Sequence, residues 1–226
     1  MTAARTSAPL SAPVEDYLKA VFELEAEGEA AGTNEIAAAL AIAPASASEM
    51  VRRLANQGLI AYERYRGARL TAAGRRIALS TIRRHRVIES YLTIALGYAW
   101  DRVHDEAERL EHAASDELIE RMAAAIGEPT TDPHGAPIPT RDGRLTEQPL
   151  IALSGVAAGE HVCVQRVADR DATQLRRLAK LGIIPGRHIQ VVAAGAADRD
   201  VQVRVGGVRR TIAAVLASQV LVSTLG

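Results

Sequence analysis

The 226-residue chain has a single cysteine, no long apolar run and no net charge. One thiol, that of Cys163, excludes a disulfide framework and any zinc site built from several cysteines. No apolar run approaches the roughly 20 residues that a membrane-spanning helix needs. Residues 1–13 lack the basic-then-apolar order of a signal peptide and predict a short disordered lead. We therefore expect a cytoplasmic protein with no membrane partner.

The zero net charge conceals a segregation of charge along the chain. Of the 27 basic and 27 acidic residues, residues 44–86 hold ten arginines and only two acids, Glu49 and Glu63. Residues 87–132 hold eleven acids, opposed by three arginines. Such asymmetry indicates a polyanion partner for the basic part, or else two solvated helical faces of opposite sign. Charge alone leaves both interpretations open.

The first third of the chain shows the element order of a winged helix. Apolar spacing predicts a helix over 14–27, a short helix capped by Thr33 and a third helix that opens at Pro44 and ends by Gly58. Two short strands, 59–62 and 68–71, flank a polar stretch and predict a hairpin, and a long helix follows Thr71 to about Ala95.

The third of these helices is the expected recognition helix. Small polar residues in its first turn can reach base edges, while arginines one turn later and in the hairpin meet phosphate or guanine. The candidate DNA-contacting residues are Ser46, Ser48, Arg52, Arg53, Arg64 and Arg66.

Beyond the winged helix, the pattern predicts two helices, then a linker, then strands. The helices cover about 100–114 and 115–126, with Ser115 as an N-cap, and a proline-rich linker follows. Period-two segments around 161–167, 189–192, 201–205 and 208–212, interrupted by a helix over 173–181, predict a small β-barrel. Among lone residues, we expect His134, His161 and His188 at the surface, Cys163 as a small buried residue and Trp100 as a core anchor between helices.

Histidines and carboxylates of the acidic block fall on two helical faces. His85 and Glu89 are four residues apart, and the next helix repeats the pattern with His104, Glu108, Glu111 and His112. Matching registers on two helices favour a metal site with imidazole and carboxylate ligands over a solvated face of ion pairs. The same stripes would suit a helical di-metal carboxylate enzyme, but the basic block, the hairpin and the absence of repeated Glu-x-x-His motifs argue against one. A metal-independent winged-helix regulator is a further alternative.

The segments His85-Arg-Val-Ile-Glu89, Val103 to His112, Ser115-Asp116 and Asp16-Tyr17-Leu18 together resemble the diphtheria toxin repressor family. Members of that family are dimeric, metal-activated transcriptional repressors that respond to iron or manganese. The resemblance implies a mainly α protein with an N-terminal winged helix-turn-helix, a helical dimerisation and metal-binding domain, and a C-terminal SH3-like β-barrel. The expected boundaries are 14–74 for the DNA-binding domain, 75–130 for the helical domain, 131–150 for the linker and 151–226 for the SH3-like domain.

The resemblance also implies two sets of metal ligands. The primary site would draw on Asp16, Glu108, Glu111 and His112, and the ancillary site on His85, Glu89 and His104. The SH3-like domain of the family reaches back to the ancillary metal with a Glu-x-x-Gln pair, which falls on Asp171 and Gln174 here. Asp171 serves equally well as a helix N-cap.

The identity of the metal follows from two of these positions. Iron-type members tend to carry methionine and cysteine where this chain has Asp16 and Glu108, so the chain resembles the manganese type. Carboxylates suit the hard Mn²⁺ ion better than soft sulfur donors do, and Fe²⁺ is the alternative. The family resemblance implies a homodimer that binds a pseudo-palindromic double-stranded operator and controls genes for metal uptake, here manganese.

Overall fold

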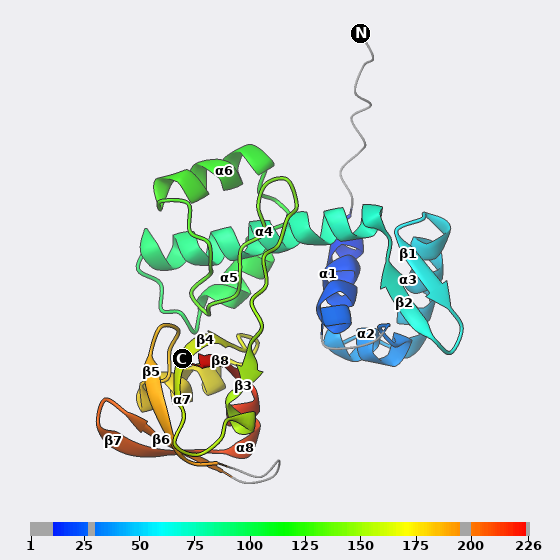
Figure 1. The fold of residues 1–226 in the computed structure, drawn as a ribbon. Helices are drawn as coiled ribbons and strands as arrows, with labels where there is room; N and C mark the ends of the chain where they lie inside the picture. Colours follow the sequence, from blue (N-terminus) through cyan, green and yellow to red (C-terminus); the bar gives the residue numbers. More distant parts are fainter. Residues whose placement is uncertain (1–10, 27–29, 195–199, 225–226) are drawn as a thin grey trace. The chain divides into compact units, whose positions relative to one another are not determined.

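The computed structural model describes residues 11–26, 30–194 and 200–224 and divides into two compact units (Figure 1). Unit 1 comprises Met1–Arg83 with Thr140–Arg144, and unit 2 comprises Arg84–Pro139 with Leu145–Gly226. The first ten residues of the predicted disordered lead lie outside the described residues. None of the described helices is both long and apolar enough to cross a membrane.

Unit 1 has the predicted winged-helix order. Its elements are α1 (Ala12–Ala26), α2 (Thr33–Ala39), α3 (Pro44–Asn56), the antiparallel strands β1 (Ile60–Glu63) and β2 (Gly67–Leu70), and the start of α4 (Ala72–Ile94). Helix α3 buries Ala47, Val51 and Leu54, whose spacing of four and three residues forms one apolar stripe. The opposite face, with Ser46 and the two arginines that follow Val51, is exposed.

A close contact fastens the hairpin to the start of α4. The Thr71 hydroxyl donates to the carbonyl of Gly58 over 2.8 Å and accepts from the amide of Gly74 over 3.2 Å. A Cβ atom at Gly74 would lie 2.0 Å from the carbonyl oxygen of Leu59, so only glycine allows the helix to approach the strand this closely. The glycine near the start of the long helix therefore has a packing role.

The helical part of unit 2 contains the second half of α4, together with α5 (Val103–Leu110) and α6 (Asp116–Ala125). The Ser115 hydroxyl caps α6 by accepting from the amide of Leu118 over 3.2 Å, as predicted. Helix α5 is shorter than the predicted 100–114, because turns precede Val103 and follow Leu110. The three helices share a small apolar core around Val87, Ile88 and Ile119.

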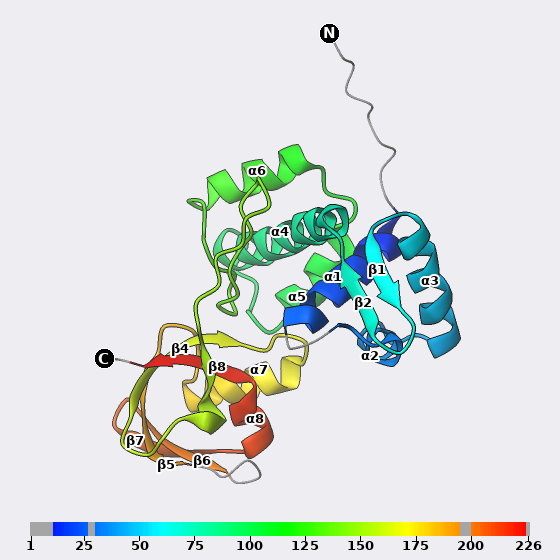
Figure 2. The ribbon, with the colours of Figure 1, turned by 45° about the vertical axis from the view of Figure 1, so that its right-hand side comes forward.

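Among the residues described, the C-terminal part of unit 2 is a six-stranded antiparallel sheet. Its order is β3-β8-β4-β5-β6-β7, from β3 (Ile151–Ala152), β4 (His161–Val167), β5 (His188–Ala193), β6 (Val201–Val205), β7 (Val208–Ile212) and β8 (Val220–Thr224). Short helices η1 (Leu153–Gly155), α7 (Ala172–Leu181) and α8 (Ala214–Ser218) complete it. Figure 2 shows strands β4 to β8 together with α7 and α8. Register shifts in β4 and β5 mark bulges that let such a small sheet bend around its core. The thiol of Cys163 is buried in β4, and His161 and His188 are exposed, as expected.

Part of the predicted linker is folded onto unit 2. The Ile138 amide donates to the Thr130 carbonyl over 2.8 Å, and the Asp132 amide donates to the Ala136 carbonyl over 2.9 Å. The expectation that His134 lies at the surface is wrong, since its side chain has no exposed area.

Trp100 packs on the core of the sheet domain and stacks on His134, with ring centroids 5.7 Å apart, rather than lying between helices.

Candidate metal centre

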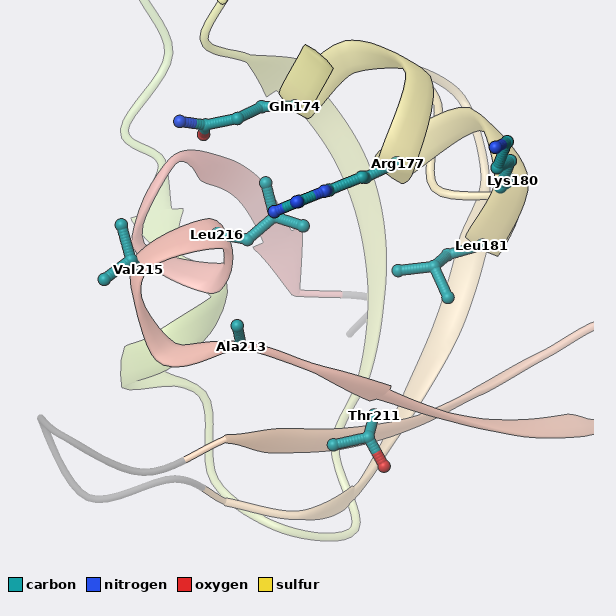
Figure 3. A pocket seen from close by; sticks show the side chains of 8 residues that line it. All are labelled: Gln174, Arg177, Lys180, Leu181, Thr211, Ala213, Val215 and Leu216. Atoms are coloured by element: carbon teal, nitrogen blue, oxygen red, sulfur yellow. The ribbon is translucent and has the colours of Figure 1, made fainter.

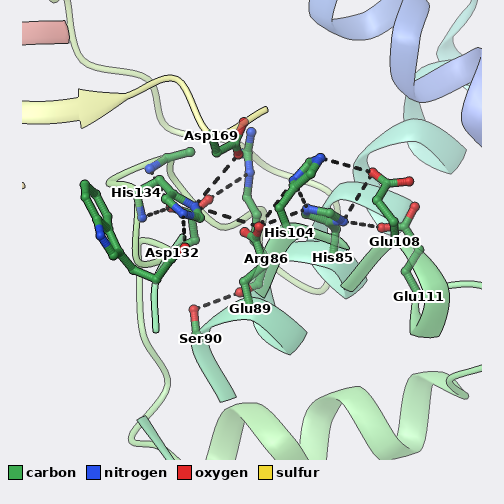
Figure 4. Close-up of polar contacts among 12 residues, drawn as sticks. His85, Arg86, Glu89, Ser90, His104, Glu108, Glu111, Asp132, His134 and Asp169 are labelled. Carbon is green, nitrogen blue, oxygen red and sulfur yellow. Dashed lines mark hydrogen bonds and ion pairs between the residues drawn. The ribbon is translucent and has the colours of Figure 1, made fainter. Parts of the chain in front are cut away.

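Helices α4 and α5 bring the three expected ancillary ligands together (Figure 4). His85 and Glu89 are one turn apart on α4, and the His85 Nε2 atom lies 3.1 Å from Glu89 Oε1. His104 projects from α5 and places its Nδ1 atom 3.2 Å from the same nitrogen of His85. The i, i+4 spacing predicted that His85 and Glu89 lie together on one helix face. The packing of α5 against α4 adds His104 to this pair.

The second half of α5 and the turn after it add carboxylates on the other side of His85. The His85 Nδ1 atom lies 2.5 Å from Glu111 Oε2 and 3.7 Å from Glu108 Oε1. His112 Nε2 lies 3.5 Å from the other carboxylate oxygen of Glu111. His85 is thus the junction between residues expected in the primary and ancillary sites. The remaining expected primary ligand, Asp16, is on α1 in unit 1.

The donor set and its burial fit a divalent cation. Ligand atoms of His85, His104 and Glu108 all lie within 4.8 Å of one another. Glu89 has no exposed area, and neither of its carboxylate oxygens makes a hydrogen bond. A buried carboxylate without hydrogen bonds is costly, and metal coordination is one of the arrangements that satisfies it. Imidazole and carboxylate are ligands for Mn²⁺, Fe²⁺ and Zn²⁺.

Glu89 also faces a second group of polar residues that the sequence analysis missed. His134 Nδ1 lies 3.8 Å from Glu89 Oε1 and 3.9 Å from Asp169 Oδ2, and Asp132 completes a set of ligand atoms within 4.8 Å of one another. Asp132 also pairs with Arg86, with Nε and Oδ2 3.5 Å apart. No sequence pattern indicated Asp132, His134 and Asp169 as a group, because they come from a loop and from the segment after β4.

The pKa values of this buried group are strongly perturbed. Burial raises the pKa of Glu89, but its interactions with His104, His134 and His85 outweigh burial and hold the pKa well below its usual range. Burial, together with the charge of Glu89, raises the pKa of Asp132 to about 6 against the pull of Arg86. Burial lowers the pKa of His134, yet Glu89 and two aspartates raise it to about 9. A positive charge placed among Glu89, Asp132 and His134 would therefore be strongly stabilised.

The side chain of Asp132 holds the loop that carries His134. Asp132 Oδ1 accepts from the amides of His134 and Ala136, over 2.8 and 2.9 Å. Gly135 has a φ of +88°, and a Cβ atom there would lie 1.8 Å from the carbonyl oxygen of Gln165 in β4. The loop can therefore approach the sheet only with glycine at this position.

We expect Gly135→Ala to displace the loop, because the added methyl group collides with the β4 backbone and its φ is strained. The positive φ alone should lower the free energy of unfolding by about 1–3 kcal/mol, the typical cost of a residue in a disfavoured backbone conformation. The collision with the Gln165 carbonyl should add to that loss, so the total should be larger. Gly143→Ala is the matched control, since Gly143 also has a positive φ, +76°, but a Cβ atom there meets nothing within 4 Å. Equal thermal stability of the two variants would contradict the close approach.

Asp171 lies outside the clusters of possible metal ligands among the described residues. Asp171 caps α7 by accepting from the amides of Thr173 and Gln174, and these bonds hold its pKa below the usual range. Gln174 lines a surface pocket of about 420 Å³ between α7, the end of β7 and α8, with Arg177, Leu181 and Val215 among its other lining residues (Figure 3). Among the described residues, the sheet domain's carboxylate in the clusters of ligand atoms is that of Asp169. A metal-binding role for Asp171 and Gln174 stays a prediction.

The predicted DNA-contacting residues lie on one helix and one hairpin of unit 1. Ser48 is half-buried. The other five are exposed: Ser46, Arg52, Arg53, Arg64 and Arg66. At the hairpin tip, Tyr65 is 90% exposed with a φ of +69°, and the Arg64 guanidinium lies 4.9 Å from the centre of its ring. An exposed aromatic ring flanked by arginines suits contact with nucleic acid, and the sequence analysis overlooked it.

Comparisons with known proteins agree with this architecture. Residues 9–68 match the family profile described as "Iron dependent repressor, N-terminal DNA binding domain", and residues 71–140 match "Iron dependent repressor, metal binding and dimerisation domain". Residues 151–224 match the FeoA domain, which corresponds to the predicted SH3-like barrel.

Among similar proteins, the iron-dependent repressor IdeR of Mycobacterium leprae is 30% identical over 197 residues, covering 81% of this chain and 85% of the relative. The diphtheria toxin repressor of Corynebacterium jeikeium is 38% identical over 128 residues, covering 57% of this chain and 53% of the relative. A solved structure titled "Manganese-dependent transcriptional repressor complex with manganese" superposes with a TM-score of 0.89 at 36% identity, covering 94% of this chain and all of the other.

The proteins that match are repressors, so the enzyme alternative is excluded, and the matched domains are those of DNA binding and of dimerisation. The histidine and carboxylate cluster falls within the matched metal-binding domain. By its element order, its cluster of histidines and carboxylates and its relatives, the chain belongs to the diphtheria toxin repressor family of metal-dependent transcriptional repressors.

Proposed function

We propose that the chain is a Mn²⁺-activated repressor that binds a pseudo-palindromic operator as a homodimer and controls genes for manganese uptake. The observation that carries the choice of metal is the donor set. Every side chain in the clusters of possible ligands among the described residues offers oxygen or imidazole nitrogen. The only thiol, that of Cys163, is buried in β4, where it donates to a backbone carbonyl. The clusters therefore lack the sulfur donors that discriminate most against Mn²⁺, and their carboxylates suit this hard ion.

In this proposal, the metal supplies positive charge to side chains that repel one another without it. Asp16 on α1 would join Glu108, Glu111 and His112 at the primary site, and His85, Glu89 and His104 would form the ancillary site. Cross-domain coordination would restrict the orientations that the DNA-binding domain adopts before it meets DNA. Because less ordering then remains for the binding step, metal and operator stabilise each other's binding, which is a coupling free energy between two sites.

The direct test measures operator affinity under three conditions. An operator is first selected from a random pool of duplexes in saturating Mn²⁺, and its dissociation constant is then measured with Mn²⁺, with Fe²⁺ kept anaerobic and with a chelator. We expect tight binding with Mn²⁺ and weak binding with the chelator. Tighter binding with Fe²⁺ than with Mn²⁺ would favour the iron-activated alternative, which the name of the mycobacterial relative supports. Equal binding in chelator would contradict metal activation.

The arginines of α3 and of the hairpin should contact phosphates. Removing one phosphate contact by Arg53→Ala or Arg66→Ala should weaken binding to operator and to scrambled DNA alike, and lower the salt slope by about one unit. The ion pair of Arg66 with Glu63, at 3.3 Å, offers little competition because both side chains are exposed. The measurement is a titration at several salt concentrations with Mn²⁺ saturating.

Two further variants serve as a negative control and as a test of base recognition. Arg209→Ala removes an exposed arginine from β7 in the sheet domain and should leave the salt slope unchanged. Ser46 lies nearer the helix N-terminus, so Ser46→Ala should instead alter the ratio of affinities for operator variants. An unchanged salt slope in both Arg53→Ala and Arg66→Ala would assign these arginines to a solvated face.

A further inference from the structure

We propose that Glu89, Asp132, His134 and Asp169 form an additional metal site, next to the His85–His104 cluster and sharing the Glu89 carboxylate with it. The ligand atoms of the four residues all lie within 4.8 Å of one another. They come from α4, from the folded part of the linker and from the segment between β4 and α7. None of them except Glu89 belongs to the ligand sets that the family resemblance implies.

Unsatisfied buried atoms point into this site. The side chains of Glu89, Asp132 and His134 have no exposed area. Glu89 Oε1 and Oε2, Asp132 Oδ2 and His134 Nδ1 are buried and make no hydrogen bond. Two of these atoms do have charged neighbours, since His85 Nε2 lies 3.1 Å from Glu89 Oε1 and Arg86 Nε lies 3.5 Å from Asp132 Oδ2. Several such atoms facing one another are rare in a folded protein unless an ion or a water lies between them.

The orientation of the His134 ring fixes which nitrogen faces the site. Its Nε2 atom lies 2.8 Å from the carbonyl oxygen of Trp100, and a carbonyl can only accept, so Nε2 carries the hydrogen. In the neutral ring this leaves the lone pair on Nδ1, the atom that faces Glu89 and Asp169. A backbone carbonyl that orients a histidine in this way is a usual partner of a metal-binding imidazole.

The spacing of the donors suits an ion rather than direct contact. His134 Nδ1 lies 3.8 Å from Glu89 Oε1 and 3.9 Å from Asp169 Oδ2, which is too long for a hydrogen bond. Two donors held about 2.1 Å from one octahedral ion lie between about 3 and 4.2 Å apart. The charges agree as well: three carboxylates and Arg86 leave two negative charges when His134 is neutral, which one divalent cation balances.

Glu89 Oε1 connects this site to the histidine pair. The same atom lies 3.1 Å from His85 Nε2, 3.5 Å from His104 Nδ1 and 3.8 Å from His134 Nδ1 (Figure 4). A carboxylate so placed can bridge two cations. Asp169, whose side chain is 29% exposed, is the ligand nearest to solvent and marks the route of entry. Occupancy would tie the linker loop and the sheet domain to α4.

The test counts metal ions on the full chain and does not depend on operator binding or on the proposed function. Mn²⁺ is the probe, with equilibrium dialysis against buffered free Mn²⁺ and elemental analysis of the protein. Asp169→Asn should weaken one binding step by at least about tenfold, the order seen when a metal site loses a supporting contact, and leave the others unchanged. His134→Gln should weaken the same step. His104→Asn should weaken a different one, and Asp200→Asn, at an exposed aspartate of the sheet domain, should change none.

Low-temperature electron paramagnetic resonance provides the second readout. Two Mn²⁺ ions that share Glu89 should give an exchange-coupled spectrum, which Asp169→Asn and His104→Asn should each convert to the spectrum of isolated ions. Circular dichroism checks that each variant is folded.

The proposal is overturned if Asp169→Asn and His134→Gln bind Mn²⁺ with the wild-type stoichiometry and affinity. A chain that binds all of its Mn²⁺ as expected, yet shows no metal-dependent affinity for DNA, would contradict the proposed function and leave this site intact.

Discussion

Glu108→Ala should reduce the operator affinity measured in Mn²⁺ to the value measured in chelator, a loss of at least about 100-fold, the upper end of what removing a supporting group around a metal costs. The carboxylate lies 3.7 Å from His85 Nδ1 and 3.9 Å from His104 Nε2, and it is also an expected primary ligand. Its removal should therefore affect both expected sites. The helical fold should persist, because the side chain is 42% exposed and stands among like charges.

The matched control is Glu106→Ala on the same helix. Glu106 pairs with Arg109 at 2.6 Å on α5, outside the clusters of possible ligand atoms among the described residues. It should leave Mn²⁺ binding and operator affinity unchanged. Wild-type activation of Glu108→Ala at the same free Mn²⁺ concentration would remove Glu108 from the ligand set.

Residues with a regular spacing could be placed from the sequence because local periodicity determines their geometry. His85 and Glu89 share a helix face at i, i+4, and His104 follows on a helix whose apolar stripe must face the same core. The winged helix was predictable for a similar reason, since Thr71, Gly58 and Gly74 mark its turn and cap. The strands from 161 to 212 showed their period of two. In contrast, β3 has only two residues, and β8 begins with three apolar residues in a row, which hides its alternation.

The second group of polar residues was not predictable, since nothing local in the sequence relates its members. His134 lies in a stretch rich in proline and glycine, a composition typical of an exposed linker. Its burial arises from tertiary contacts: the Asp132 side chain holds the turn, Gly135 lets it approach β4, and the Val167 amide donates to the His134 carbonyl over 2.9 Å. Asp169 is more than 30 residues away in sequence. The one sequence signal that could have indicated this site is a possible metal ligand, His134, directly before a glycine, Gly135, in a tight turn.

The double variant Asp16→Met with Glu108→Cys should shift activation from Mn²⁺ towards Fe²⁺ or Co²⁺. A thioether and a thiolate replace two carboxylates, and softer donors discriminate against Mn²⁺, the weakest binder in the divalent series. The ratio of the operator dissociation constants measured in Mn²⁺ and in anaerobic Fe²⁺ should change by at least about tenfold, the lower end of the effect of altering a metal's surroundings.

The single variants, Asp16→Met and Glu108→Cys, show which of the two positions determines selectivity. Cys163→Ala in the same background excludes a contribution from the native thiol, which is buried in β4. Co²⁺ offers a spectroscopic check, since a thiolate ligand adds a charge-transfer band that the wild-type chain should lack. If the double variant binds metal, shows that band and still responds best to Mn²⁺, then selectivity does not reside in these two side chains. The geometry of the remaining histidine and glutamate ligands would then have to account for it.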